Sequence, residues 1–375
     1  MISPAPRVAL ALLLFLSTAP SWSQGITART IVLGQSAPLS GPYRAEGEEV
    51  RNGALAYLRR LNDAGGLYGR RIELATLDDA GDPERALANT RRFIEEFDVF
   101  ALLAYPERSA TPEVLDLVSA SRTLMVAPVS GASRARRPGR SVFAVRAGYA
   151  QELDGIVAYY AGLGLRRMAI LRPANAAGAS RAAAVRAALA KRELPPPKDL
   201  AVTAGGSAAA AREGKAVGAD VLIVALPPPS AAELVRALRQ AGTGAQIVVT
   251  SAADAAAVAQ ALGVTGAGVS LSQVVPPLDR ISLPLVSEYR AAYEAEAGAP
   301  MFSPASLESY LGAKVLAEAL RRVGPEPGRD KLRLALEAMA VHDTGGHLVH
   351  YSRTARHGSD RIYLLAIGRD GGLLH

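Results

Sequence analysis

The sequence predicts an α/β protein made of two doubly wound lobes with parallel sheets. The chain has 375 residues, which is too long for one compact core and suits two domains of ordinary size. From residue 30 onward, short apolar runs alternate with amphipathic helical stretches. Such runs are typical of strands covered on both faces, and a repeating strand-helix order builds parallel sheets. Hydrophobic residues make up 49% of the chain, which is enough to fill two cores.

The expected strands are short, aliphatic and rich in β-branched residues. In chain order they are 31–33, 72–76, 100–104, 124–127, 142–145, 168–171, 221–225, 247–250, 269–275 and 362–367.

The helices between them show three- and four-residue apolar spacing. In the first helix, the residues on the apolar face are Val50, Ala54, Leu58 and Leu61. We expect this helix to end at Gly65 and Gly66, because glycine readily adopts the left-handed conformation that closes a helix. The second helix is expected to begin with Asp82 as N-cap and Pro83 in its first turn.

The chain is expected to cross between the lobes three times, at 146–149, after 269–275 and within 345–351. The division that follows places residues 28–146 and 276–346 in lobe 1, and residues 147–275 and 347–375 in lobe 2. Ligand sites of doubly wound domains lie outside the carboxyl ends of the strands. The loops expected at those ends are 39–47, 105–111, 128–132, 173–178, 227–230 and 250–254.

Residues 1–23 have the pattern of a signal peptide. Arg7 precedes an apolar run over 8–16, and small residues at Ser21 and Ser23 suit cleavage after Ser23. The run is too short to span a bilayer, so we expect an exported, periplasmic protein. The chain contains no cysteine, which predicts no lipid anchor and no disulfide.

The charge pattern argues against a nucleic-acid partner. The formal net charge is +7, and the densest basic patch comprises Arg134, Arg136, Arg137 and Arg140. No aromatic residue is interleaved there for base stacking, so we interpret the patch as a solvated loop.

Several ordered blocks of the sequence carry a family resemblance. They are IVLGQSAPLSGP at 31–42, LNDAGG at 61–66, YGRRIEL at 68–74, LDDAGDP at 77–83, APVSGA at 127–132, SQVVP at 272–276, SLPLV at 282–286 and LESYLG at 307–312. Together they resemble the branched-chain amino-acid (Leu/Ile/Val)-type substrate-binding proteins of ABC transporters, over essentially the whole chain after the signal peptide.

This resemblance implies a type I periplasmic-binding fold, in which two α/β lobes joined by three crossing strands close on a ligand by hinge motion. It implies a small-molecule ligand, no cofactor, a transient partnership with an ABC permease in the inner membrane, and no enzymatic activity. We expect a monomer. A ligand sensor that feeds a regulator or receptor is the alternative function.

The resemblance also marks candidate ligand-binding residues in the first lobe. The Ser/Thr position of the third loop falls on Arg108, with Ser109 adjacent and Tyr105 at the start of the loop. Ser130 and Gly131 match the pattern of the fourth loop, whereas the aromatic position of the first loop falls on Glu46.

Other family positions are changed in the second lobe. The tyrosine position holds Ala177, and a second aromatic position falls near Pro227. The acidic position for a ligand ammonium group falls near Ser251, with Asp254 the nearest carboxylate. These departures predict a ligand other than ordinary leucine, isoleucine or valine.

Each first-lobe candidate has a structural alternative. Arg108 beside Ser130 would form a charge-assisted grip on a carboxylate, but Arg108 could equally be solvated or pair with Glu107. Glu46 would hold an ammonium group, although a carboxylate is favoured at the start of a helix in any case. Ser130 would either contact the ligand or only form hydrogen bonds within its own turn.

Metal and catalytic sites are not expected. His347 and His350 are three residues apart, which places them on opposite faces of a strand. A strand end and a helix cap account for Asp78, Asp79 and Asp82 without a cation. The sequence has no glycine-rich phosphate loop and no nucleophile elbow.

Overall fold

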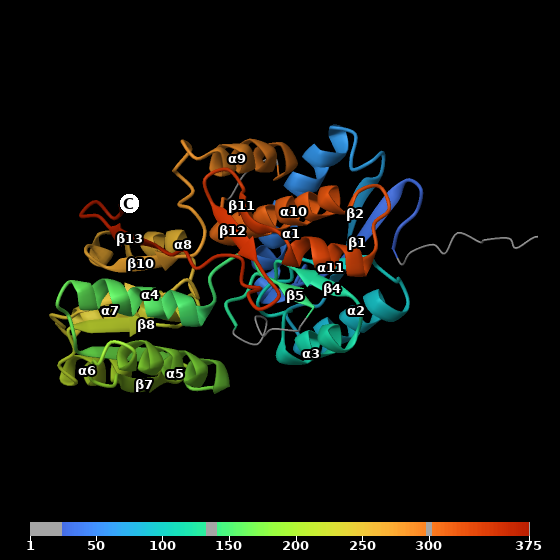
Figure 1. Cartoon of the computed structure of the whole chain (residues 1–375). Helices are drawn as coiled ribbons and strands as arrows, with labels where there is room; N and C mark the ends of the chain where they lie inside the picture. Colours follow the sequence, from blue (N-terminus) through green and yellow to red (C-terminus); the bar gives the residue numbers. More distant parts are fainter. Residues whose placement is uncertain (1–24, 133–140, 298–301, 375) are drawn as a thin grey trace, which may run out of the picture.

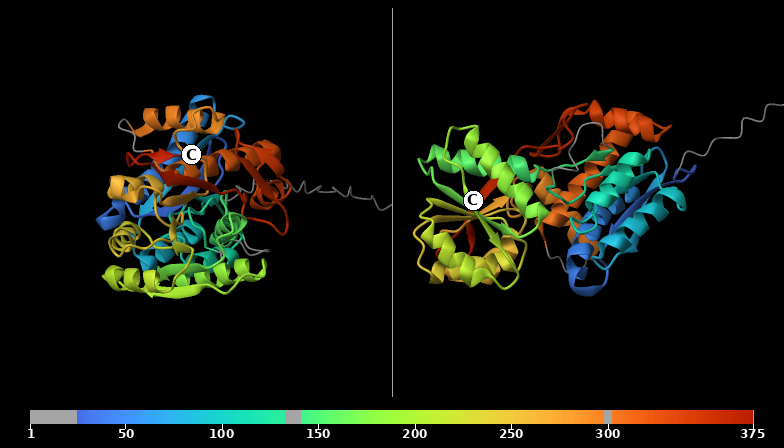
Figure 2. Two further views of the ribbon diagram at one scale, coloured as in Figure 1. Left: turned by 90° about the vertical axis from the view of Figure 1, so that its left-hand side faces the viewer. Right: turned by 90° about the horizontal axis from the view of Figure 1, so that it is seen from below.

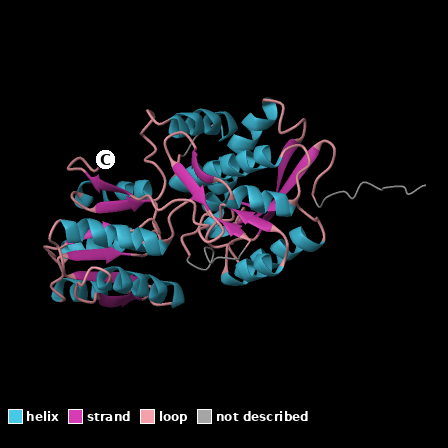
Figure 3. Cartoon of the chain, in the orientation of Figure 1, coloured by secondary structure: helices cyan, strands magenta, loops and turns pink. Residues whose placement is uncertain are grey.

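A computed structural model describes residues 25–132, 141–297 and 302–374. The chain forms two lobes that lie side by side (Figures 1 and 2), each with helices packed against a sheet (Figure 3). The predicted signal peptide at 1–23 and the four arginines of the basic patch lie outside the described residues. Within the described ranges, no helix combines the length and the apolar character needed to cross a membrane.

The first lobe contains a five-stranded sheet in the order β2-β1-β3-β4-β5, with every neighbouring pair parallel. Its strands are β1 (Thr30–Ala37), β2 (Arg71–Asp78), β3 (Ala101–Leu103), β4 (Leu124–Val126) and β5 (Val142–Phe143). Ala37 pairs with Asp78 at the carboxyl ends of β1 and β2. This shared end is the edge from which the first-lobe loops start.

Six α-helices accompany this sheet in the described part of the first lobe. They are α1 (Arg44–Asp63), α2 (Pro83–Glu95), α3 (Pro112–Ala120), α9 (Pro284–Ala297), α10 (Pro304–Val323) and α11 (Arg329–Glu337), and a short 3-10 turn, η1 (Gly41–Tyr43), precedes α1. The four residues predicted for the apolar face of α1 are all buried. Asp82 caps α2 as predicted, because its carboxylate accepts hydrogen bonds from the backbone N–H groups of Glu84 and Arg85.

Helix α1 packs closely against α10, although the two are far apart in the sequence. A Cβ at Gly53 would lie 2.1 Å from the carbonyl oxygen of Ser306, so only glycine permits this approach. One turn further, the rings of Tyr57 and Tyr310 meet edge to face with centroids 5.2 Å apart. The C-terminal third of the chain therefore completes the core of the first lobe.

The second lobe contains a seven-stranded sheet in the order β14-β13-β10-β9-β8-β6-β7. Its strands are β6 (Met168–Pro173), β7 (Lys198–Val202), β8 (Val221–Val224), β9 (Gln246–Val249), β10 (Ser270–Gln273), β13 (Tyr363–Ile367) and β14 (Leu373–Leu374). The strands from β6 to β10 run parallel, as predicted, but β13 is antiparallel to β10 and β14 is antiparallel to β13.

The helices of the second lobe are α4 (Tyr149–Gly162), α5 (Ala176–Ala190), α6 (Ser207–Ala216), α7 (Ser230–Gln240) and α8 (Ala255–Leu262), followed by the 3-10 turn η3 (Gly263–Gly266). Asn175 and Asp254 cap α5 and α8 with side-chain oxygens that accept from Gly178 N and Ala257 N. These two caps lie at the edge of the lobe that faces the first lobe.

The third crossing follows a hairpin that the sequence did not predict. Strands β11 (Ala340–Asp343) and β12 (Leu348–Tyr351) pair antiparallel. Val349 and Tyr351 are buried in the core of the first lobe, and the Tyr351 hydroxyl donates to the carbonyl of Ala144 at 2.8 Å. The predicted division placed residues from 347 onward in lobe 2, but alternate side chains of β12 point into the core of the first lobe. The chain therefore still belongs to the first lobe at Tyr351 and stays with it at Arg356, whose carbonyl accepts from Ala144 N at 2.9 Å.

Candidate functional site

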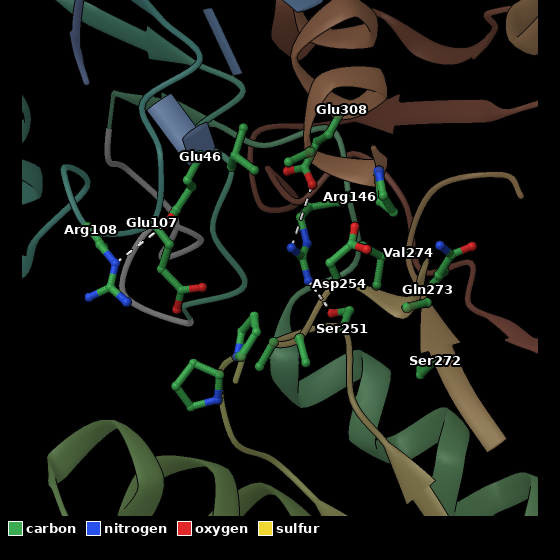
Figure 4. Close-up of a pocket in the computed structure, with 18 of the residues that line it drawn as sticks. Glu46, Glu107, Arg108, Arg146, Ser251, Asp254, Ser272, Gln273, Val274 and Glu308 are labelled. Atoms are coloured by element: carbon green, nitrogen blue, oxygen red, sulfur yellow. Dashed lines mark hydrogen bonds and ion pairs between the residues drawn. The ribbon is translucent and has the colours of Figure 1, made fainter. Parts of the chain in front are cut away.

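A cavity of about 470 Å³ lies between the two lobes. All six loops predicted at the carboxyl ends of the strands contribute at least one residue to its wall, so the prediction that they converge is confirmed. The connections between the lobes contribute Arg146, Ser272, Gln273 and Val274. Figure 4 shows the side chains of both lobes around this space.

One charged pair at the cavity wall joins Arg108 to Glu46. Arg108 Nε lies 3.4 Å from Glu46 Oε2, and the guanidinium group stacks over the ring of Tyr43 at 3.6 Å from the centroid. Glu46 is thus the carboxylate partner, rather than the sequence neighbour Glu107. Burial raises the pKa of Glu46, and the positive charge of Arg108 opposes that rise.

A second charged pair spans the two lobes. Arg181 Nη2, on α5, lies 3.5 Å from Glu107 Oε1, in the loop after β3. The Tyr149 hydroxyl donates a short hydrogen bond to the same carboxylate, and the Arg181 guanidinium lies 4.2 Å from the centroid of the Tyr149 ring. Because Arg181 and Glu107 come from opposite lobes, this contact favours the arrangement in which the lobes approach each other.

Arg146, in the first crossing, connects a third group of charges. Its guanidinium donates to Ser251 Oγ at 2.6 Å and lies 3.5 Å from a Glu308 carboxylate oxygen (Figure 4). Glu152 accepts from the Ser251 backbone N–H and hydroxyl, each at 2.7 Å, and lies 3.9 Å from Arg146. Arg146 is only 4% exposed. Burial is the largest single influence and opposes the charge, but the combined Coulombic attraction of Glu308, Tyr149, Glu152 and Glu107 outweighs it and raises the pKa of Arg146, so it stays charged.

Two carboxylates of the wall have no cationic partner within 4.0 Å among the described residues: Glu49 on α1 and Asp254 at the start of α8. Burial raises the pKa of each. Asp254 adds to the rise at Glu49, which shows that the two charges, one from each lobe, repel across the space. Hydrogen bonds from Ser303 to Glu49 and from Ala257 N to Asp254 only partly offset the burial.

The wall also offers neutral polar atoms. Gln273 Oε1 and Ser272 Oγ are buried and have no hydrogen-bond partner among the residues that the structure describes. Both residues belong to β10, at the carboxyl end where the chain starts its second crossing. These two atoms lie behind the surface of the cavity, and among the described residues of the wall carboxylates outnumber guanidinium groups.

The structure brings four of the eight candidate residues to the cavity wall: Glu46, Arg108, Ala177 and Ser251. Ser251 uses its hydroxyl to bridge Arg146 and Glu152. A contact of these four residues with ligand stays a prediction.

The other four candidates are outside the wall and have structural partners. Ser109 is buried and donates to Asp79 at 2.6 Å, and the Tyr105 ring lies in the core with its hydroxyl 3.3 Å from that of Thr90. Ser130 Oγ accepts from Ala132 N at 3.2 Å, as its turn alternative predicts. A Cβ at Gly131 would lie 2.6 Å from the Tyr149 ring, so this glycine allows close packing.

Sequence reasoning did not assign a role to several charged residues of the wall. Glu49 lies three residues after Glu46 and therefore on the same face of α1, and Arg181 lies one turn after Ala177 on α5. Glu308 is part of the quoted block 307–312. Helical spacing from the named candidates would have found the first two, but no local signal indicated that Arg146 would meet Glu308.

The aspartates and histidines for which the sequence predicted no metal site have structural partners instead. Asp79 accepts from Ser36 and Ser109, and Asp78 accepts from the backbone N–H groups of Leu39 and Ala80. These bonds fit the strand-end interpretation. The buried ring of His347 lies beside Tyr363, with Nδ1 3.3 Å from the hydroxyl oxygen, and not with the ring of His350.

Comparisons with known proteins agree with this architecture. Residues 30–372 match the model of a family described as periplasmic binding protein. The chain is 25% identical over 295 residues to an amino acid binding protein from Pseudomonas aeruginosa, a match that covers 76% of this chain and 78% of that protein. It is 28% identical over 222 residues to Leu/Ile/Val-binding protein homolog 3 from Brucella melitensis. That match spans 58% of this chain and 60% of the relative, which is less than two thirds of its length.

Among solved structures, an extracellular ligand-binding receptor from Verminephrobacter eiseniae superposes with a TM-score of 0.82. It is 30% identical to this chain and covers 92% of this chain and 100% of its own.

Proposed function

Because this chain belongs to the periplasmic binding protein family, we propose that it is the solute-binding component of an ABC importer. The family is not enzymatic, and the fold is the type I periplasmic-binding fold. A small solute would enter between the lobes, the hinge would close, and a membrane permease would receive the closed form. The cavity between the lobes and the contact between Glu107 and Arg181 across it support this proposal.

Export is part of the same proposal. Family members are periplasmic binding proteins, and residues 1–23 have the composition of a signal peptide. We expect the mature protein to begin at Gln24.

For the ligand, we propose an amino-acid-like solute with a basic side group. The observation that carries this assignment is the charge of the wall, to which the residues that the structure describes contribute five carboxylates and three guanidinium groups. Each guanidinium group already lies within 4.0 Å of a carboxylate: Arg108 with Glu46, Arg146 with Glu308, and Arg181 with Glu107. Charged groups in a closed cleft are costly unless they are paired. A ligand cation would supply the partner that Glu49 and Asp254 lack among the residues that the structure describes.

The carboxylate of such a ligand would lie toward Arg108. Stacking on Tyr43 occupies one face of this guanidinium and leaves its edge for hydrogen bonding, and the side chain is 36% exposed. The changed positions in the second lobe, with Ala177 and Pro227 at the wall in place of aromatic residues, support a ligand other than ordinary leucine, isoleucine or valine.

The test is a thermal-shift screen of the mature protein, followed by calorimetry. Basic amino acids should raise the melting temperature, because a ligand that binds only the native state stabilises it. Neutral amino acids and dicarboxylates should give smaller shifts or none. A shift with dicarboxylates alone would overturn the assignment of a cationic ligand, and no shift with any class would indicate a relative that binds a partner protein instead of a solute.

A matched pair of variants locates the cationic group. Glu49→Gln should weaken binding by about tenfold or more, because it removes one charge of a charge-assisted contact. Glu48→Gln is the control, since Glu48 lies on the same helix, pairs with Arg44 at 2.8 Å and is not part of the wall. Equal affinities of the two variants would contradict a role for Glu49.

A further inference from the structure

Two histidines and an aspartate converge beside the third crossing, away from the cavity between the lobes. His350 Nε2 lies 3.9 Å from Asp360 Oδ2, and His357 Nε2 lies 2.8 Å from Asp360 Oδ1. One donor atom from each of the three residues lies within 4.8 Å of the other two. The rings of the two histidines meet at 87°, with centroids 5.7 Å apart.

The backbone explains why these residues meet. His350 is the penultimate residue of β12, and beyond Tyr351 the chain turns back, with Ser352 N donating to Ala355 O at 2.9 Å. The returning segment pairs with β12, because His350 N donates to Gly358 O at 2.7 Å. His357 precedes this pairing point, and a second turn, with Ser359 N donating to His357 O, brings Asp360 back toward both rings.

We propose that His350, His357 and Asp360 form a binding site for a divalent transition-metal ion such as Zn²⁺. Imidazole nitrogens and a carboxylate are standard zinc ligands, with bond lengths of about 2.0–2.2 Å, so tetrahedral ligand atoms lie roughly 3.4 Å apart. The observed separations of 2.8 and 3.9 Å from Asp360 to the two imidazoles lie on either side of this value. Water would supply the fourth ligand.

A divalent ion accounts for this cluster better than an ion pair does. The contact of His357 with Asp360 needs only two of the residues, yet a second imidazole points its Nε2 at the same carboxylate. Two neutral imidazoles and one carboxylate are a common ligand set for Zn²⁺, and such a set uses all three residues.

Because the site lies at the start of a connection between the lobes, a bound ion would affect hinge motion. The segment from β12 to β13 runs from the first lobe to the second (Figure 1). Ligands from β12 and from residues 357–360 would fasten the start of this crossing to the first lobe. The site would thus hold one of the three connections on which hinge motion depends.

The experiment uses mature protein without a histidine tag, stripped with chelator and titrated with Zn²⁺ alone. We expect about one equivalent to bind with a dissociation constant on the order of 1–10 µM, and Co²⁺ to give the visible absorption of a tetrahedral site. His350→Ala and His357→Ala should each weaken Zn²⁺ binding by about tenfold or more, because one of three protein ligands is lost. Far-UV circular dichroism shows whether each variant is folded.

His342→Ala is the matched control, because His342 lies on β11 and outside the cluster. It should bind Zn²⁺ as the parent does. Binding by the parent weaker than about 100 µM, or equal binding by the parent and by the double variant His350→Ala/His357→Ala, would overturn the proposal. The titration contains no solute ligand, so its failure leaves the proposed transport function unaffected.

Discussion

Replacing Arg146 by methionine should be among the most destabilising single changes in the first crossing. Arg146 and its neighbours Glu152 and Glu308 are 4%, 0% and 2% exposed. Methionine preserves much of the side-chain volume but leaves two buried carboxylates without their guanidinium group. Removing one partner of a buried ion pair costs about 3–5 kcal/mol, because the remaining charge is left without a counter-ion where water screens it poorly. We expect a loss of this size in the free energy of unfolding.

The control is Arg44→Met. Arg44 Nε lies 2.8 Å from Glu48, closer than Arg146 lies to Glu308, but its side chain is 64% exposed. Exposed pairs contribute about 0–1 kcal/mol. The comparison therefore separates burial from distance as the cause of the loss.

The assay is urea unfolding of the ligand-free protein, followed by far-UV circular dichroism. The double variant Arg146→Met/Glu308→Gln should recover part of the lost stability, because the second change removes one of the two uncompensated charges. The reasoning is refuted if Arg146→Met costs no more than Arg44→Met, or if the second substitution adds its own loss to the first.

Three further predictions concern binding and processing. Arg108→Ala should abolish detectable binding of a carboxylate-bearing ligand in calorimetry, and unchanged affinity would remove Arg108 from the site. Affinity for a cationic solute should be full at about pH 8 and fall toward about pH 5. Burial raises the pKa values of Glu49 and Asp254, so their protonation as the pH falls removes the charges that attract the solute. Binding titrations at both pH values check this, and Glu49→Gln should make the affinity less dependent on pH. Trp22 is the only tryptophan and lies in the predicted signal peptide, so protein purified from the periplasm should show no tryptophan emission, and a tryptophan spectrum would refute cleavage after Ser23.

The sequence predicted the elements whose signals are local. Each strand with a near-continuous apolar run was found except the two-residue β14 (Leu373–Leu374), and the N-cap at Asp82 was found as well. Strand β7 was missed because it is an edge strand with the burial pattern exposed, exposed, buried, exposed, buried, and three prolines precede it. The β11–β12 hairpin was missed because two glycines in its turn suggested a linker. Such a turn also suits a hairpin, and only the packing of Val349 and Tyr351 distinguishes the two.

The sequence predicted where the candidate site lies, but only some of the side chains that line it. Loops after parallel strands meet at one edge, so the wall of the cavity could be located from strand ends alone. Which side chains enter it depends on rotation about each helix and on partners from distant segments. Ser109 and Arg108 are adjacent, yet Ser109 points to Asp79 in the interior and Arg108 to Tyr43 at the wall. No local pattern predicts that difference.

The packing of α1 on α10 bears on how the protein is made. Gly53 and Tyr57 leave the ribosome early, whereas Ser306 and Tyr310, on which they pack, follow only after the whole second sheet except its last two strands has been synthesised. Until then α10 is absent, and the face of α1 that packs against it is uncovered. A chain truncated before residue 304 should therefore expose this face and aggregate, and a nascent chain needs protection there for most of its synthesis.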